Sequence, residues 1–85
     1  MNKQKPDIFE KIYFISIDPE DKSPVVLCET MNKINMYITS NGGCIEMDSY
    51  DSNYSLGRMS FKLGTNPDPD ATLCYISSLS GVKFI

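Results

Sequence analysis

The 85-residue chain contains one arginine, no histidine and no tryptophan, and its net charge is −3. We expect residues 1–85 to form a single domain. The core of a domain of this size leaves little room for a deep catalytic cleft. Histidine is the usual general base near neutral pH and the commonest metal ligand, so its absence favours binding over catalysis. The sequence carries no catalytic or cofactor motif, and we expect a non-enzymatic protein without a cofactor.

Three widely spaced cysteines, Cys28, Cys44 and Cys74, form no C-x-x-C pair. An odd number of isolated thiols suits a reducing compartment, because small secreted domains more often carry an even disulfide framework. The most apolar run, Ile12 to Ile17, is much shorter than the roughly 18 residues that a membrane span needs. We therefore expect a cytoplasmic protein that does not associate with membranes.

The first third of the chain predicts a tail and a β-hairpin. Residues 1–6 predict a flexible tail, because they offer charged and amide groups but nothing to pack. From Phe9 to Ile17, β-branched and aromatic residues give two apolar faces, which indicates a central strand. The proline-containing acidic stretch 18–24 favours a turn, and Val25 to Cys28 is predicted to resume as the second strand of the hairpin.

The stretch from Thr30 to Gly43 fits two interpretations. Its apolar residues alternate as in a strand, but they also follow the spacing of an amphipathic helix. Thr30 can cap the start of a helix, and Asn41-Gly42-Gly43 can end one, although Asn-Gly is also a hairpin-turn signal. The ends of the segment favour a helix near residues 30–41.

The second half of the chain predicts further strands. Cys44 to Tyr50 alternates, with Ile45 and Met47 on one face and Glu46 and Asp48 on the other. It is expected to pair across the polar loop 51–53 with a strand from Leu56 to Leu63, which places Ser60 outside. The two remaining predicted strands are Ala71–Ser77 and a short edge strand, Val82–Ile85. The expected fold class is α+β, a small mostly antiparallel sheet of about five strands with one helix, and the alternative is an all-β fold.

The loop Asn66 to Asp70 begins like a calcium-binding loop, because oxygen ligands stand at alternate positions. The match then fails, since Ala71 stands where glycine is needed and Ser77 where a bidentate glutamate is needed. Two prolines would also stiffen a loop that must wrap an ion. We expect a plain turn here and no metal site.

Charge distribution narrows the class of partner. Residues 18–55 contain seven Asp and Glu residues but only two lysines, so this stretch carries a net negative charge. Such a surface repels phosphate backbones and anionic lipid and favours a basic partner. The basic residues of the chain are scattered instead of clustered with aromatics, so we expect no direct nucleic-acid binding.

The densest polar and aromatic segment is Asp48 to Tyr54. Tyrosine offers a large contact area at low entropy cost, and Ser, Asn and Asp offer adaptable hydrogen bonds, as in many binding loops. The alternative is a strand end and a hairpin turn with the tyrosines packed over the sheet. The predicted partner-binding residues are Glu46, Asp48, Tyr50, Asp51 and Tyr54.

The leading hypothesis is a small protein-binding module, an inhibitor or adaptor, that engages a basic protein surface. Many phage- and plasmid-encoded inhibitors are also small and lack catalytic groups. This is an analogy and not a family match. The alternative is a self-associating structural or accessory subunit, in which Val82–Ile85 extends the sheet across a homodimer.

Overall fold

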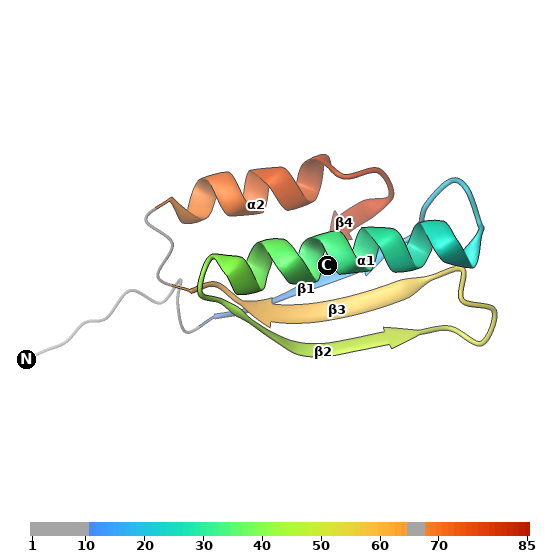
Figure 1. The fold of residues 1–85 in the computed structure, drawn as a ribbon, viewed down its shortest axis with the longest axis horizontal. Helices are drawn as coiled ribbons and strands as arrows, with labels where there is room; N and C mark the ends of the chain where they lie inside the picture. The colour runs from blue at the N-terminus through green and yellow to red at the C-terminus, as the bar shows by residue number, and fades with distance from the viewer. Residues whose placement is uncertain (1–10, 65–67) are drawn as a thin grey trace, which may run out of the picture.

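A computed structural model describes residues 11–64 and 68–85, and residues 1–10 and 65–67 lie outside the described part. The predicted tail, 1–6, and part of the predicted loop at 66–70 therefore lie outside it as well. The elements follow the order βαββαβ (Figure 1), which is that of the split βαβ arrangement. Their bounds are β1 (Ile12–Ile17), α1 (Pro24–Ser40), β2 (Cys44–Tyr50), β3 (Gly57–Lys62), α2 (Pro69–Ser78) and β4 (Val82–Phe84).

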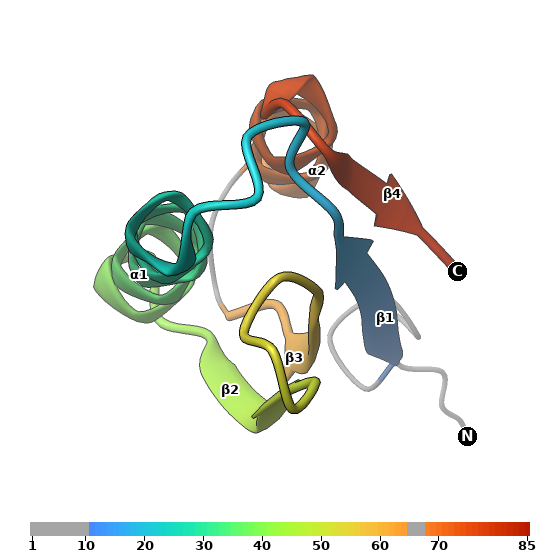
Figure 2. The same ribbon diagram turned by 90° about the vertical axis from the view of Figure 1, so that its right-hand side faces the viewer.

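The four strands form one antiparallel sheet in the order β2-β3-β1-β4. The α+β class is thus confirmed and the all-β alternative is wrong. In the described residues the sheet has four strands, not about five, and two helices accompany it, not one. Both helices lie on the same side of the sheet, as the end-on view shows (Figure 2). No described helix or strand covers the opposite side. Neither helix of the described part is long and apolar enough to cross a bilayer.

Strand β1 is central, as predicted, because it pairs with β3 on one side and β4 on the other. Ile15 and Ile17 are fully buried toward the helices, whereas Phe14, which precedes Ile15, is 50% exposed on the other face. The predicted edge strand at the end of the chain is confirmed as β4. The predicted pairing of β2 and β3 across a short loop is confirmed too.

The predicted strand Val25–Cys28 is wrong, because these residues form the first turn and a half of α1. The Ser23 hydroxyl accepts a hydrogen bond from the backbone N–H of Val25 at 3.2 Å. Pro24 follows as the first helical residue, where its missing N–H costs nothing. Thr30, expected to cap the helix, lies within it and its hydroxyl donates to the carbonyl of Val26. The predicted hairpin around the acidic loop is therefore a strand-to-helix connection.

The end of α1 follows the prediction closely. Gly43 N–H donates to the carbonyl of Ile38 at 2.9 Å, and Gly42 N–H donates to that of Thr39 at 3.1 Å. This pair of bonds is the Schellman arrangement. It needs a left-handed residue, and Gly42 supplies it with φ of 86°.

The predicted strand Ala71–Ser77 is also wrong, because these residues belong to α2. The carboxylate of Asp68 accepts a hydrogen bond from the backbone N–H of Ala71 at 3.2 Å, and Pro69 is again the first helical residue. Residues 68–70 are the described part of the predicted calcium-like loop, and they form the cap and the first residues of α2. Ile76 on α2 is fully buried against the sheet.

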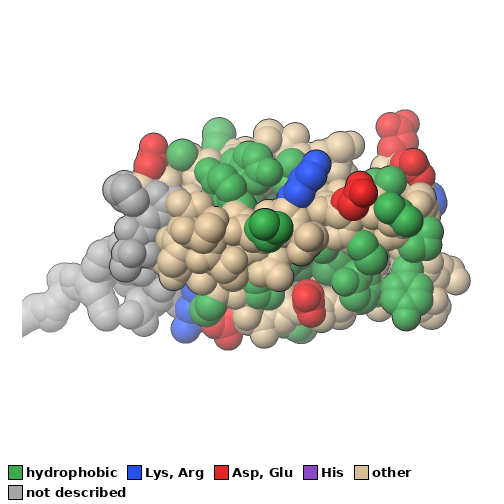
Figure 3. Space-filling model, in the orientation of Figure 1, with side chains coloured by type: hydrophobic (Ala, Val, Ile, Leu, Met, Phe, Trp, Pro, Cys, Tyr) green, Lys and Arg blue, Asp and Glu red, His purple; other side chains and the backbone are tan. Residues whose placement is uncertain are grey.

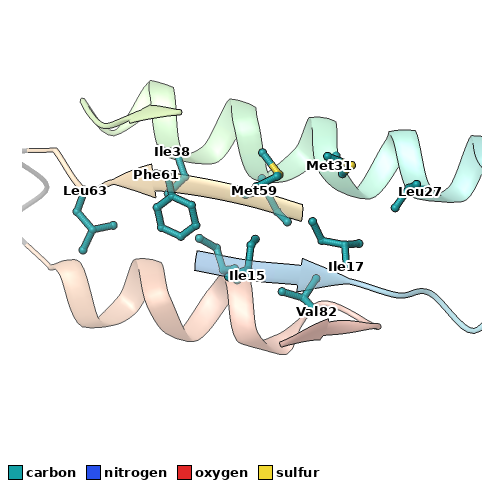
Figure 4. Close-up of a cluster of buried hydrophobic side chains, with 11 residues drawn as sticks. Ile15, Ile17, Leu27, Met31, Ile38, Met59, Phe61, Leu63 and Val82 are labelled. Carbon is teal, nitrogen blue, oxygen red and sulfur yellow. The ribbon is translucent and has the colours of Figure 1, made fainter. Parts of the chain in front are cut away.

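The hydrophobic core lies between the sheet and the two helices (Figure 4). The helix α1 contributes side chains spaced by four, three and four residues, which form one continuous stripe. The sheet contributes the alternate residues of β1 and β3, and Phe61 stacks on Tyr13 with ring centroids 5.9 Å apart. The buried hydrophobic side chains are Ile15, Ile17, Leu27, Met31, Ile34, Ile38, Met59, Phe61, Leu63, Ile76 and Val82.

A β-bulge in β2 overturns the predicted faces of that strand. Ile45 pairs with Phe61 and Met47 pairs with Ser60, so Glu46 is the extra residue. Ile45 therefore faces the helices while Met47 faces away from them, and the two do not share a face as predicted. Ser60, expected to be exposed, is only 3% exposed because the partner side chains from β1 and β2 lie on either side of it.

Candidate partner-binding site

The predicted binding segment lies at the end of β2 and in the loop that leads to β3. Asp51 organises this loop. Its carboxylate accepts hydrogen bonds from the backbone N–H groups of Ser55 (2.8 Å) and Leu56 (3.1 Å) and from the Ser55 hydroxyl (3.1 Å). These donors, foremost the N–H of Ser55, hold the pKa of Asp51 below its ordinary value. This carboxylate therefore shapes the loop, which restricts its freedom to meet a partner.

Two tyrosines form an exposed aromatic pair beside this loop. The rings of Tyr50 and Tyr54 have centroids 5.5 Å apart and are tilted by 52°. Tyr50 is 43% exposed and Tyr54 52% exposed. Tyr54 has φ of 56°, a left-handed backbone conformation that a bulky residue rarely adopts. The loop thus holds an aromatic ring at the surface at some cost in backbone strain.

A groove of about 370 Å³ runs between α1 and β2. We call it the α1–β2 groove. One wall comes from α1 and includes Glu29, and the other comes from β2 and includes Asp48 and Tyr50. Burial, followed by the neighbouring Cys28 thiol and the Asp48 carboxylate, raises the pKa of the Tyr50 hydroxyl. The remaining lining residues are Cys28, Met31, Asn32 and Asn35.

The geometry divides the predicted site residues into two groups. Asp48 and Tyr50 line the groove, and Tyr54 joins them through its contact with Tyr50. Glu46 lies at the bulge, where the Cys44 thiol donates to its carboxylate at 3.4 Å. Because Cys44 pairs with Lys62 on the face away from the helices, Glu46 is not part of the groove.

Sequence reasoning missed the helical wall of this groove. Glu29, Asn32 and Asn35 stand on successive turns of α1 and face β2. The interpretation of residues 25–28 as a strand hid this relation. The signal was present in Ser23-Pro24, a capping residue followed by a proline that suits the first helical position.

The groove can bind a positively charged side chain. It presents carboxylates on both walls, amide groups and the face and hydroxyl of a tyrosine, and none of the described lysines or arginine lines it. Acidic side chains also gather around the loop between β1 and α1, at the upper right of Figure 3. Within residues 11–64 and 68–85, no group of three or more Cys, Asp or Glu side chains is placed to hold a metal ion.

Comparison with family models, with curated proteins and with solved structures finds no significant match for this chain.

Proposed function

We propose that the protein is a non-enzymatic binding module that engages a basic protein partner through the α1–β2 groove and the adjacent tyrosine pair. The observation that carries the proposal is the placement of Glu29 and Asp48 on opposite walls of one groove, with Tyr50 beside them. An inserted lysine or arginine would meet a carboxylate on each side and an aromatic ring, and charge-assisted bonds of this kind are the stronger ones.

Strand β2 adds a second contribution. It is an edge strand, so one of its sides is not paired within the sheet. An extended partner segment can add to such an edge by main-chain hydrogen bonds while its alternate side chains enter the neighbouring groove. The bulge at Glu46 limits this pairing to the straight part of the strand, residues 47–50, which is the part that flanks the groove.

An inhibitor or adaptor role fits a module of this kind, since either role needs binding without turnover. The three cysteines are unpaired and exposed, which supports a reducing, cytoplasmic location.

The test begins with the partner captured by the purified chain from host lysate, followed by affinity measurements on that partner at two salt concentrations. Glu29→Lys and Asp48→Lys should each weaken binding about tenfold and flatten its salt dependence, because they remove the electrostatic attraction. Glu46→Lys is the matched control, because it makes the same change on the same strand outside the groove. Equal losses in all three variants, or no loss in the two groove variants, would contradict the proposal.

Self-association is the second candidate function. It is supported by the free edge of β4 and by an apolar groove of about 530 Å³ between β4 and α2, to which Tyr13, Leu73 and Phe84 contribute. A second copy could add its own β4 to this edge and so extend the sheet across a homodimer. Sedimentation at increasing concentration would then show a dimer that Phe84→Glu abolishes, and a strict monomer at high concentration would exclude this function.

A further inference from the structure

The face of the sheet that points away from the helices has an ordered arrangement of side chains. We call it the open face. The register sorts its residues into three rows that run across the strands, because directly paired residues share a face. The rows are Cys44–Lys62–Ile12, then Met47–Ser60–Phe14, and then Ser49–Arg58–Ser16–Lys83.

The middle row is apolar at its surface. Phe14 is 50% and Met47 46% exposed, and the small Ser60 between them is almost fully buried. Ile12, 39% exposed, extends this apolar surface along β1. The two large side chains therefore stand on either side of a buried serine. We call this apolar row, Met47–Ser60–Phe14, the ridge.

Cations flank the ridge on both sides. Lys62 belongs to the row on one side, and Arg58 and Lys83 belong to the row on the other. Rows on one face of a strand are about 7 Å apart along the backbone, so a row that carries a cation lies next to the ridge in each direction. None of these three cations forms an ion pair with another described residue, and among the residues of the four strands Glu46 is the one acidic side chain on this face. A protein of net charge −3 thus concentrates positive charge on one apolar face.

We propose that the open face is a second binding surface and that its partner is an acidic amphipathic helix of another protein. A helix with side chains is about 10 to 12 Å wide. When its apolar stripe lies on the ridge, carboxylates on its two flanks can reach Lys62 on one side and Arg58 and Lys83 on the other. This surface is separate from the α1–β2 groove, because Met47 and Asp48 project to opposite faces of β2. The chain would then join a basic partner to an acidic one.

Other occupants fit the open face less well. A second copy bound face to face would bring the cations of both copies together, which is repulsive. Single-stranded nucleic acid would meet the cations, but among the strand residues of this face it would find one aromatic ring, Phe14, and one guanidinium, that of Arg58. Stacking of successive bases needs several such planes along the path of the nucleic-acid strand. Serine occupies the neighbouring position on β3 and methionine the next one on β2.

The test uses a synthetic 18-residue helical peptide with a leucine stripe flanked by glutamates, titrated into the ¹⁵N-labelled chain and followed by NMR. Shifts should be confined to residues of the three rows. Phe14→Ala, Lys62→Glu and Arg58→Glu should each weaken binding about tenfold, whereas Lys33→Glu and Met36→Ala, exposed on α1, should leave it unchanged. A peptide with the same composition in scrambled order controls for charge alone.

Thermal unfolding of each variant separates loss of binding from loss of fold. Shifts on the helix side, equal binding of the scrambled peptide, or no effect of the open-face variants would overturn the inference. Tighter binding of a 12-nucleotide oligothymidylate or of phosphatidylserine vesicles than of the peptide would overturn it too, because the cations would then serve phosphate recognition. Loss of peptide binding with retained binding of the basic partner in the open-face variants would separate this surface from the α1–β2 groove.

Discussion

At the scale of single residues, the predicted binding segment combines residues that shape the loop with residues that face outward. The Asp51 carboxylate accepts hydrogen bonds from backbone N–H groups of the loop, whereas Asp48 and Tyr50 line the groove. From the sequence alone these roles looked equivalent, because aspartates three positions apart carry the same charge. Only the path of the chain after β2 decides which carboxylate turns inward to the loop. The two carboxylates lie in one predicted segment, but which of them shapes the loop could not be read from the sequence.

Replacement of Asp51 by asparagine should lower the melting temperature at pH 7. The folded-state pKa of Asp51 is depressed by the Ser55 and Leu56 N–H groups, so the charged form stabilises the fold. That contribution is fully present above the unfolded-state pKa, about 4, and is lost as the pH falls through the lower folded-state pKa. Thermal unfolding of both proteins between pH 7 and pH 2 should show the difference shrinking below about pH 4.

The control for this prediction is Asp48→Asn, which makes the same change on the strand next to the loop. It should leave the melting temperature at pH 7 close to that of the unchanged chain, because the Asp48 carboxylate accepts no backbone hydrogen bond from the described residues of the loop. A gap between Asp51→Asn and the unchanged chain that stays constant down to pH 2 would mean that ionisation of Asp51 is not the source of the stabilisation.

At the scale of elements, the strands were predictable and the helix starts were not. The two apolar faces of β1 and the alternation in β3 each indicate a strand, and the glycines after α1 indicate a change of chain direction whether a helix or a strand precedes them. Val25–Cys28 and Ala71–Ser77 are short apolar runs that suit a strand or a buried helix equally. The prolines before them were interpreted as residues of turns, but Pro24 and Pro69 both begin helices behind a capping side chain. The bulge at Glu46 has no signal in the sequence, because it arises from the pairing with β3.

The start of α1 depends on the Ser23 cap. Ser23→Ala removes the acceptor for the Val25 N–H and should cost about 1 kcal/mol in the free energy of unfolding. Ser23→Asp should restore most of this loss, because an aspartate can accept the same bond. Urea denaturation of the three proteins measures the difference. A Ser23→Asp variant as unstable as Ser23→Ala would show that the hydroxyl acts in some other way.

The bulge should limit pairing at the edge of the sheet. Deletion of Glu46 leaves Ile45 opposite Phe61 and Met47 opposite Ser60, so the variant should keep its fold and its register. Its straightened edge strand should associate more readily with other strands, since bulges protect edges. Sedimentation at rising concentration should show more self-association than in the unchanged chain. Deletion of Ser49 is the contrast, because it moves Tyr50 to the wrong face and should destabilise the fold.

At the scale of the whole molecule, a small core supports two differently charged surfaces. Eleven buried hydrophobic side chains form that core, and β2 separates the acidic groove from the cationic open face. Phe14 and Met47 are large hydrophobic side chains that do not belong to this core, because they lie on the side of the sheet away from the helices. The uneven charge along the chain showed the acidic side, but the cations on β3 and β4 come together only through the strand order.

A core of this size should tolerate no large loss. At roughly 0.05 to 0.15 kcal/mol per residue, the whole chain is stable by about 4 to 13 kcal/mol. Phe61→Ala empties the centre of the core and should cost about 3 to 5 kcal/mol, enough to unfold much of the population if the chain lies at the lower end of that range. Met36→Ala on the exposed side of α1 removes a side chain that is 63% exposed and should stay within about 0.5 kcal/mol of the unchanged chain. Urea titrations that place the two midpoints together would mean that the interior can repack around a lost phenyl ring, and the assignment of Phe61 to the centre of the core would then be wrong.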